Sequence, residues 1–317
     1  MGHCGNYRHL GRTEYKISRI GLGTAEIGFA YGIGSRSLPT EEEAENILNT
    51  AVDLGITYFD TANFYQLAEE RIGRSGIAKI KGVLVGTKCG QFLEQGELLE
   101  PLEIQKRIEE QVEDSLRKLQ LDSLPLLYLH GGSRGQIESG LLIDILQNLK
   151  DKGKIRYTGI STRGEEAPLA AVRTGFFDVI QVAYSILDQR MAKEVLAEAH
   201  RNNIGVINRS VLLKGSLTPL VHQLPPSLEK LKEHSAIAEK IAKKHRMSLP
   251  QLAICFVASE NRIASSLIGT NKVGHLKAAV NAASPGPLWE EILSQLRLLA
   301  IDDPRQVDPA HWPPLSS

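Results

Sequence analysis

The 317-residue chain has few cysteines and no excess of either charge. Its three cysteines, Cys4, Cys89 and Cys255, are widely separated and form no CxxC pair. We therefore expect free thiols in a reducing, cytoplasmic compartment and no metal site. The 37 basic and 37 acidic residues cancel, and no basic patch indicates binding to nucleic acid. No apolar run approaches the roughly 18 residues of a membrane span, and the N-terminus lacks the apolar segment of a secretory signal.

A glycine-rich GxGxxG motif, which opens the helix of a Rossmann dinucleotide-binding unit, is also missing, because Gly21 and Gly23 do not continue into one. What the chain does contain is a regular alternation of short apolar runs and amphipathic runs. The apolar runs predict strands at residues 20–24, 56–59, 82–87, 124–129, 155–160, 177–182, 204–208 and 264–268. The amphipathic runs predict helices at residues 40–54, 69–77, 102–119, 137–150, 165–173, 190–201, 227–245, 248–259, 272–282 and 288–299.

Eight such strand–helix units in about 300 residues predict an α/β fold of the (β/α)8 TIM-barrel type. Residues 7–18 form a predicted hairpin around Gly11, which would close the N-terminal end of the barrel. No linker divides the chain, so we expect a single domain over residues 1–317 with an irregular, proline-rich tail at about 302–317. An open, doubly wound sheet is the alternative, and the missing GxGxxG motif disfavours it.

Polar residues collect at the carboxyl ends of the predicted strands. In a barrel these ends face one common opening, where the active sites of TIM barrels lie. Each residue alone has an ordinary structural explanation, such as a solvated strand end or a hydrogen-bonded core histidine. The occurrence of all of them at matching strand ends indicates a catalytic site. This site also includes Tyr65, five residues after Asp60. The strand-end residues are Asp60, Lys88, His130, Ser161, Gln181, Arg209 and Gly269.

The chain resembles the aldo-keto reductases from about residue 7 to residue 282. The segments that carry the resemblance are Gly55-Ile-Thr-Tyr-Phe-Asp-Thr-Ala with Tyr65, Val85-Gly-Thr-Lys88, Tyr128-Leu-His130, Gly153-Lys-Ile-Arg-Tyr-Thr-Gly-Ile-Ser161, Val179-Ile-Gln181 with Tyr184, and Ser210-Val-Leu-Leu-Lys-Gly-Ser216. The order Asp60, Tyr65, Lys88, His130 is the most specific part. The resemblance implies a (β/α)8 barrel that binds NADPH or NADH without a Rossmann domain.

The four catalytic candidates make chemical sense for the reduction of a carbonyl, which needs a hydride at carbon and a proton at oxygen. Tyr65 is the expected general acid, but an unperturbed phenol has a pKa of about 10. A nearby Lys88 ammonium would favour the phenolate and lower that pKa, and Asp60 would hold Lys88 charged and oriented. His130 would hydrogen-bond the carbonyl oxygen and place it beside Tyr65.

The resemblance also implies the cofactor contacts. Ser161 and Gln181 match positions that bind the nicotinamide carboxamide, and Thr162 stands where the family usually has Asn. Arg209 replaces an aromatic residue, so its planar guanidinium is expected to stack on the nicotinamide or, alternatively, to turn towards a phosphate or carboxylate. The pyrophosphate loop includes Ser210, Leu212, Lys214 and Gly215. The adenosine end includes Gly269, Thr270, Asn271, Lys272 and His275, of which the last two favour NADPH over NADH.

The sequence therefore predicts an NADP-dependent oxidoreductase that acts on an aldehyde, a ketone or a sugar, with no nucleic acid or membrane partner and no signature of a defined oligomer. One alternative is a regulatory NADPH-binding barrel that resembles the potassium-channel β subunits; the complete catalytic set argues against it. Another is a lyase that forms a Schiff base through Lys88. The loops at 25–39, 91–99 and 217–226, together with the tail, would set the substrate specificity.

Overall fold

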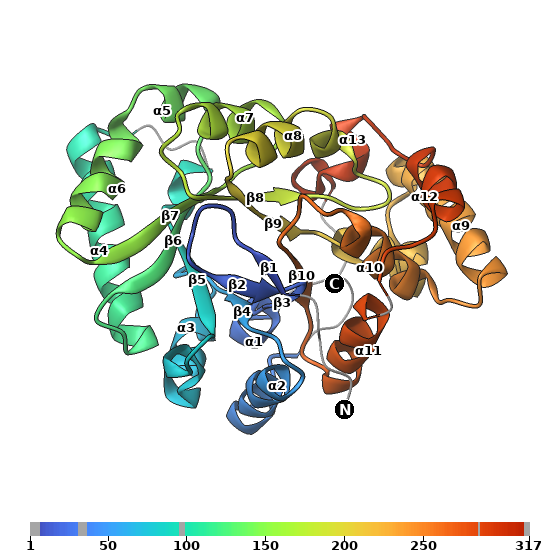
Figure 1. Cartoon of the computed structure of the whole chain (residues 1–317), viewed down its shortest axis with the longest axis horizontal. Helices are drawn as coiled ribbons and strands as arrows, with labels where there is room; N and C mark the ends of the chain where they lie inside the picture. Colours follow the sequence, from blue (N-terminus) through green and yellow to red (C-terminus); the bar gives the residue numbers. More distant parts are fainter. Residues whose placement is uncertain (1–6, 31–36, 95–98, 285, 314–317) are drawn as a thin grey trace.

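The computed structural model describes residues 7–30, 37–94, 99–284 and 286–313. Eight parallel strands close into a barrel in the order β10-β3-β4-β5-β6-β7-β8-β9, so β3 pairs with both β4 and β10 (Figure 1). The predicted (β/α)8 barrel is therefore confirmed. The strands are β3 (Ile20–Gly23), β4 (Tyr58–Asp60), β5 (Leu84–Cys89), β6 (Leu124–His130), β7 (Ile155–Ser161), β8 (Val179–Ala183), β9 (Gly205–Arg209) and β10 (Ser265–Gly269).

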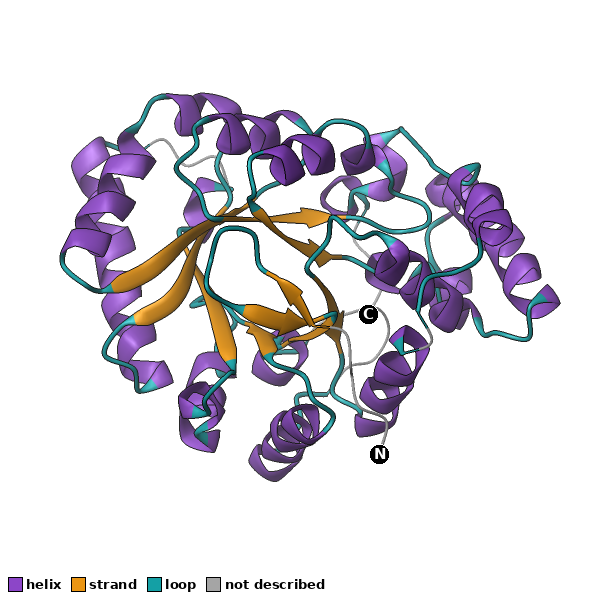
Figure 2. Cartoon of the chain, in the orientation of Figure 1, coloured by secondary structure: helices purple, strands orange, loops and turns teal. Residues whose placement is uncertain are grey.

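Helices surround the strands, as Figure 2 shows by colour. Among the described residues, three of them begin with a capping box: Thr40 caps α2, Ser133 caps α5 (Arg134–Glu138) and Ser248 caps α10. Each cap accepts a hydrogen bond from the backbone three residues on. The longer helices are α2 (Glu41–Asp53), α3 (Ala68–Ser75), α4 (Pro101–Leu119), α6 (Leu141–Asp151), α7 (Glu166–Arg173), α8 (Val195–Arg201), α9 (Glu229–Lys244), α10 (Leu249–Ser259), α11 (Val273–Ala283) and α12 (Glu290–Arg297). Within the described ranges, no helix has both the length and the apolar character to cross a bilayer.

The N-terminal hairpin closes the bottom of the barrel as predicted. Strands β1 (Tyr7–His9) and β2 (Lys16–Ser18) pair in antiparallel register. Between them, Arg12 donates to the Asp178 carboxylate at 2.9 Å, just before β8 begins. Leu10 is fully buried against Gly205, where an added Cβ would come within 2.7 Å of its side chain. The hairpin therefore seals the amino ends of the strands and leaves the carboxyl ends open.

Two apolar clusters hold the fold together. The larger one packs the outward faces of the strands against the helices. The smaller one fills the barrel interior, and at its centre the hydroxyls of Tyr58 and Tyr128 lie 2.9 Å apart. Glycines make room for these two rings: a Cβ at Gly159 would lie 2.4 Å from Tyr128, and one at Gly86 would lie 2.7 Å from the Tyr58 hydroxyl. The interior is thus packed with side chains immediately below the strand ends.

Several predicted boundaries need correction. The predicted helix at 137–150 is two helices, α5 (Arg134–Glu138) and α6, because Gly140 between them adopts a left-handed φ of 84°. The predicted helix at 190–201 begins as a separate 3-10 turn, Arg190–Ala192. The predicted loop at 25–39 contains the short helix α1 (Ala25–Gly28). Residues 31–36 of that loop and 95–98 of the next lie outside the described part of the chain, as does Cys4.

The tail is not irregular over the residues that the structure describes. It contains α13 (Pro304–Val307) and a 3-10 turn at Pro309–His311. The Asp303 side chain caps α13 by accepting from the Arg305 backbone at 3.0 Å, and proline at the next position suits a helix start. Val307 is only 1 % exposed, so the segment is held by burial as well as by its caps.

Candidate active site

The strand-end residues predicted from the sequence share one layer of the barrel. Alternate residues of a strand point to the same side, and Tyr58, Tyr128, Val179 and Ile207 belong to the interior cluster. Asp60, His130, Gln181 and Arg209 each follow one of these by two residues, and Lys88 follows the interior residue Leu84 by four. The register of the strands agrees with this placement, because His130 of β6 is paired with Ser161 of β7, and Ser161 with Gln181 of β8. The polar side chains therefore converge above the two tyrosines at the open end.

Asp60 and Lys88 form a buried ion pair at the centre of this layer. Lys88 Nζ lies 2.6 Å from Asp60 Oδ2 and 2.8 Å from the carbonyl oxygen of Thr61. The side chain of Lys88 is only 1 % exposed and that of Asp60 only 4 %. Burial lowers the pKa of Lys88 from its ordinary value, and the Asp60 carboxylate works against that effect. This arrangement fixes the orientation of the Lys88 amino group at the open end of the barrel.

Tyr65 lies beside this pair because the loop after β4 continues the sheet. The backbone N–H of Thr61 donates to Gly86, and that of Asn63 donates to Lys88, each at 2.9 Å. On the other side α1 approaches so closely that a Cβ on Gly28 would lie 2.0 Å from the Tyr65 carbonyl oxygen. Lys88 Nζ is 5.0 Å from the centroid of the Tyr65 ring. The structure thus brings the predicted acid and the predicted ammonium together.

His130 completes the group. Its ring meets the Tyr65 ring edge to face, with centroids 6.0 Å apart. Burial holds the pKa of His130 well below its usual value, and the positive charges of Lys88, Arg209 and Arg163 lower it further. The imidazole is therefore neutral at physiological pH and can donate one hydrogen bond. Its Nδ1 is buried and finds no hydrogen-bond partner among the described residues.

Gln181 and Ser161 also converge, but with a partner that the sequence did not indicate. The Ser161 hydroxyl donates to Gln181 Oε1 at 3.3 Å, and Gln181 Nε2 donates to Asp60 Oδ1 at 2.7 Å. Both oxygens of the Asp60 carboxylate are therefore occupied, one by Lys88 and one by Gln181. A continuous hydrogen-bonded chain runs from Ser161 to Lys88, and no local pattern predicts the contact between Gln181 and Asp60, 121 residues apart.

Arg209 lies across the carboxyl ends of β7 and β9. Its Nη2 donates to the Thr162 carbonyl oxygen at 3.1 Å, and its Nη1 contacts the Ser210 hydroxyl at 3.4 Å. The Thr162 hydroxyl is buried and has no partner within the described ranges. Since a buried polar atom is costly without a hydrogen bond, this hydroxyl is available to a bound molecule.

The predicted pyrophosphate and adenosine segments flank the same opening. After β9, Ser210 adopts a left-handed φ of 64°. A 3-10 turn at Leu213–Gly215 follows, preceded by Leu212, and its Lys214 has a left-handed φ of 50°. After β10, Thr270 accepts from the Lys272 backbone at 3.0 Å, and Asn271 Nδ2 donates to the Ser37 carbonyl oxygen at 3.4 Å. Gly269, Lys272 and His275 are exposed, the last two around the start of α11. Such a helix start favours anions.

Sequence reasoning missed two charged residues next to this site. Glu69 is fully buried behind Lys88. Arg163, one residue after Thr162, forms an ion pair of 2.8 Å with Asp308 of the tail and another with Glu94. From the sequence, Glu69 is only the first residue of a predicted helix, and Arg163 lies in the loop between a predicted strand and the next helix. No local pattern marks Glu69, because its burial depends on how α3 packs. The partners of Arg163 are too distant in sequence to be anticipated.

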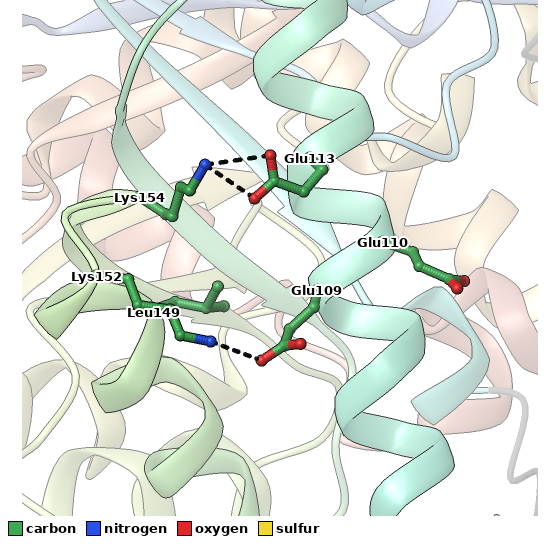
Figure 3. Close-up of a pocket in the computed structure, with 6 residues that line it drawn as sticks. All are labelled: Glu109, Glu110, Glu113, Leu149, Lys152 and Lys154. Carbon is green, nitrogen blue, oxygen red and sulfur yellow. Dashed lines mark hydrogen bonds and ion pairs between the residues drawn. The ribbon is translucent and has the colours of Figure 1, made fainter.

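A groove on the flank of the barrel is chemically different. It lies between α4 and the start of β7 (Figure 3). Four of its charged residues form two ion pairs, Lys154 with Glu113 at 3.0 Å and Lys152 with Glu109 at 3.3 Å. Lys154 immediately precedes β7, so the groove faces the end of that strand opposite to Ser161. Its ion pairs brace a helix against the barrel and form no part of the candidate active site. Among the described residues, no group of histidine, cysteine, aspartate and glutamate side chains could hold a metal ion.

Comparison with known proteins agrees with the barrel and its strand-end site. The sequence model of the aldo/keto reductase family matches residues 19–300. The chain belongs to this family of oxidoreductases.

Three relatives illustrate the similarity. The L-galactose dehydrogenase of Arabidopsis thaliana is 30 % identical over 92 % of this chain and 93 % of its own. The D-threo-aldose 1-dehydrogenase of a Pseudomonas species is 28 % identical over 89 % of this chain and 95 % of its own. The solved holo form of an aldo-keto reductase from Bacillus halodurans superposes with a TM-score of 0.77 at 26 % identity, over 96 % of this chain and 99 % of its own.

Proposed function

We propose that this protein is an NAD(P)H-dependent oxidoreductase that transfers a hydride between nicotinamide and an aldehyde, a ketone or a sugar. The observation that carries the proposal is the Asp60–Lys88 ion pair with its ammonium 5.0 Å from the Tyr65 ring centroid. The names of the relatives from Arabidopsis thaliana and Pseudomonas support sugars as one substrate class.

Tyr65 is the proton donor in reduction and the proton acceptor in oxidation. A cation close to a phenol stabilises the phenolate, so Lys88 brings proton exchange closer to neutral pH. Asp60 keeps that cation oriented by a bond of 2.6 Å. Gln181 fixes the carboxylate through its other oxygen. This chain of contacts supports a general acid whose strength is set by its neighbours.

His130 orients the carbonyl group. A neutral imidazole donates a hydrogen bond without competing with Tyr65 for the role of acid, and the pKa of His130 lies well below its ordinary value because of burial and of the nearby cations. Its ring stands edge to face with Tyr65. A carbonyl oxygen held between the two would accept from both side chains.

The residues present fit a nicotinamide dinucleotide, with NADPH preferred and NADH as the alternative. When bound, nicotinamide supplies the hydride. Ser161, Thr162 and Gln181 would hold the carboxamide, and the buried, unpartnered Thr162 hydroxyl supports this assignment. The left-handed turn at Ser210–Lys214 would take the pyrophosphate, and Lys272 and His275 the adenosine 2′-phosphate.

We further infer that the protein acts as one domain in a cytoplasmic setting, on small molecules rather than on nucleic acid. Cys89 and Cys255 support a reducing compartment, because both are buried free thiols. Burial raises the pKa of Cys89 to about 12, so this thiol beside Lys88 is unreactive and serves as packing.

The test is an NADPH-consumption screen over aldehydes, ketones and sugars, run in both directions with the wild type and Tyr65→Phe. The variant should lose about 10²- to 10⁴-fold in rate, the usual contribution of one general acid, while cofactor binding stays nearly intact. Near-wild-type reduction by Tyr65→Phe would show that the acid is another group. Borohydride trapping of a carbonyl substrate on Lys88 would instead indicate the Schiff-base lyase.

A further inference from the structure

Glu69 is a carboxylate buried on the outer side of the barrel wall. It lies in the first turn of α3, and none of its surface is exposed. Its Oε1 accepts from the Thr87 hydroxyl at 2.5 Å, and its Oε2 lies 3.5 Å from Asn63 Nδ2. A carboxylate in the first turn of a helix is favoured by the helix dipole. The proposed reaction makes no direct use of this buried group.

Two hydrogen-bond partners of Glu69, Thr87 and Asn63, lie next to Lys88 and Tyr65 in the chain. Thr87 is the residue before Lys88 on β5. Asn63 stands two residues before Tyr65, and its backbone N–H donates to the Lys88 carbonyl oxygen at 2.9 Å. The side chain of Asn63 also donates to Asp114 of α4 at 2.9 Å. Glu69 is therefore bonded to the strand that carries Lys88 and to the loop that carries Tyr65.

We propose that Glu69 is a positioning residue that holds Tyr65 and Lys88 in register and keeps a negative charge behind the ammonium. The inference rests on the proposed function. Glu69 touches neither substrate nor cofactor, because the strand β5 separates it from the barrel interior. Its effect reaches the site through Thr87, through Asn63 and through its charge.

The electrostatic part of this role has a definite sign. Burial lowers the pKa of Lys88, Asp60 and then Glu69 oppose that shift, and Arg209 reinforces it. The other groups that face Lys88 are Tyr65 and His130. Removal of a nearby negative charge favours the deprotonated form of an ammonium and of a phenol alike. Loss of the Glu69 charge must therefore move the alkaline titration of the Tyr65–Lys88 pair to lower pH.

Around Glu69 itself, burial raises the pKa of the carboxyl, while the Thr87 and Ser115 hydroxyls and Lys118 lower it and Asp114 raises it. The main variant leaves all of these neighbours on β5 and α4 unchanged. Glu69→Gln retains the shape of the side chain and removes only its charge and one acceptor. Glu70→Gln is the matched control, because Glu70 is the next residue of α3 and is half exposed beside Arg74.

The experiment measures kcat, KM, the dissociation constant of the cofactor and the pH profile of kcat for both variants. Glu69→Gln should reduce kcat about tenfold through misplacement of the acid, with unchanged cofactor affinity. The alkaline limb of its pH profile of kcat should move to lower pH. Glu70→Gln should match the wild type in kcat and in this profile. An unshifted limb with wild-type kcat in Glu69→Gln overturns the proposal. If this variant does not fold, Thr87→Val removes the shortest bond to Glu69 and should also reduce kcat.

A second readout does not depend on turnover. The Tyr65 phenol can be titrated by NMR in protein labelled with 13Cζ-tyrosine, with the signal assigned by its loss in Tyr65→Phe. Glu69→Gln should lower the titration midpoint and Glu70→Gln should not. A shifted midpoint in a protein that turns over no carbonyl substrate would refute the proposed function and leave the role of Glu69 standing. An unshifted midpoint in an active enzyme would refute the role of Glu69 alone.

Discussion

Arg163 and Asp308 are separated by 145 residues in the chain and form an ion pair of 2.8 Å beside the barrel opening. The same guanidinium pairs with Glu94, so it joins the segment after β5, the segment after β7 and the C-terminal tail. Burial raises the pKa of Asp308, but the backbone N–H of Ala310 and the charge of Arg163 outweigh it, and the pKa lies below its usual value.

This pair should contribute measurably to stability. In a double-mutant cycle of Arg163→Ala and Asp308→Asn, followed by urea unfolding at pH 7, we expect a coupling of about 0.5–1 kcal/mol. Because the folded pKa of Asp308 is depressed, the coupling is fully present above the unfolded value of about 3.9 and is lost as the pH falls through the folded pKa. Strictly additive single-variant effects at pH 7 would contradict this.

Arg209 should discriminate between the two redox states of the cofactor. A guanidinium can stack on a ring as an aromatic side chain does, but it carries a fixed positive charge. Oxidised nicotinamide is cationic and reduced nicotinamide is neutral, so a stacked Arg209 should disfavour NADP⁺. We expect Arg209→Tyr to tighten NADP⁺ relative to NADPH in equilibrium binding. An unchanged ratio of the two dissociation constants would place Arg209 away from the ring, on the Thr162 carbonyl that it contacts at 3.1 Å.

Lys272 should determine the preference for NADPH over NADH. It is exposed at the start of α11, where a cation and the helix terminus both favour a phosphate. Lys272→Ala should weaken NADPH binding about tenfold or more, as expected for one charge-assisted contact, and leave NADH binding nearly unchanged. Lys277→Ala, an exposed position on the same helix, is the control. Equal losses for both cofactors in Lys272→Ala would show that the residue does not contact the 2′-phosphate.

His130 should make the protein sensitive to acid. Its folded pKa lies well below its ordinary value because of burial, so at mildly acidic pH the unfolded chain binds a proton that the folded chain does not. Stability therefore falls as the pH drops below about 6.5, the unfolded value. In thermal unfolding from pH 7 to pH 5, His130→Gln should lose less stability than the wild type, whereas the exposed His9→Gln should behave as the wild type. Parallel curves for all three proteins would contradict the neutral imidazole.

Much of the architecture could be predicted because it depends on local chemistry. Buried parallel strands require short apolar runs, and the barrel strands β3 to β10 were all found from such runs. The failures are equally physical. The break at Gly140 needs one left-handed residue that an amphipathic pattern does not show, and the tail is ordered by the burial of Val307. Neither the break at Gly140 nor the order of the tail produces a helical periodicity of apolar residues in the sequence.

The candidate site could be predicted as a set of residues but not as a set of bonds. Asp60, Lys88 and His130 were found because strand ends meet in a barrel. The hydrogen bond from Gln181 to Asp60 depends on which side chains face inward across the barrel, and the burial of Glu69 depends on how closely α3 packs against α4. Those are tertiary facts, and a single sequence contains no direct signal for them.

The hydroxyl pair of Tyr58 and Tyr128 gives the barrel a floor. Both rings are fully buried beneath Lys88, and the hairpin lies below them. A molecule that reaches Lys88 must therefore leave by the opening through which it entered. In an enzyme with two reactants and one entrance, a product that has not departed obstructs the next arrival, so departure is a step of the catalytic cycle that can limit its speed.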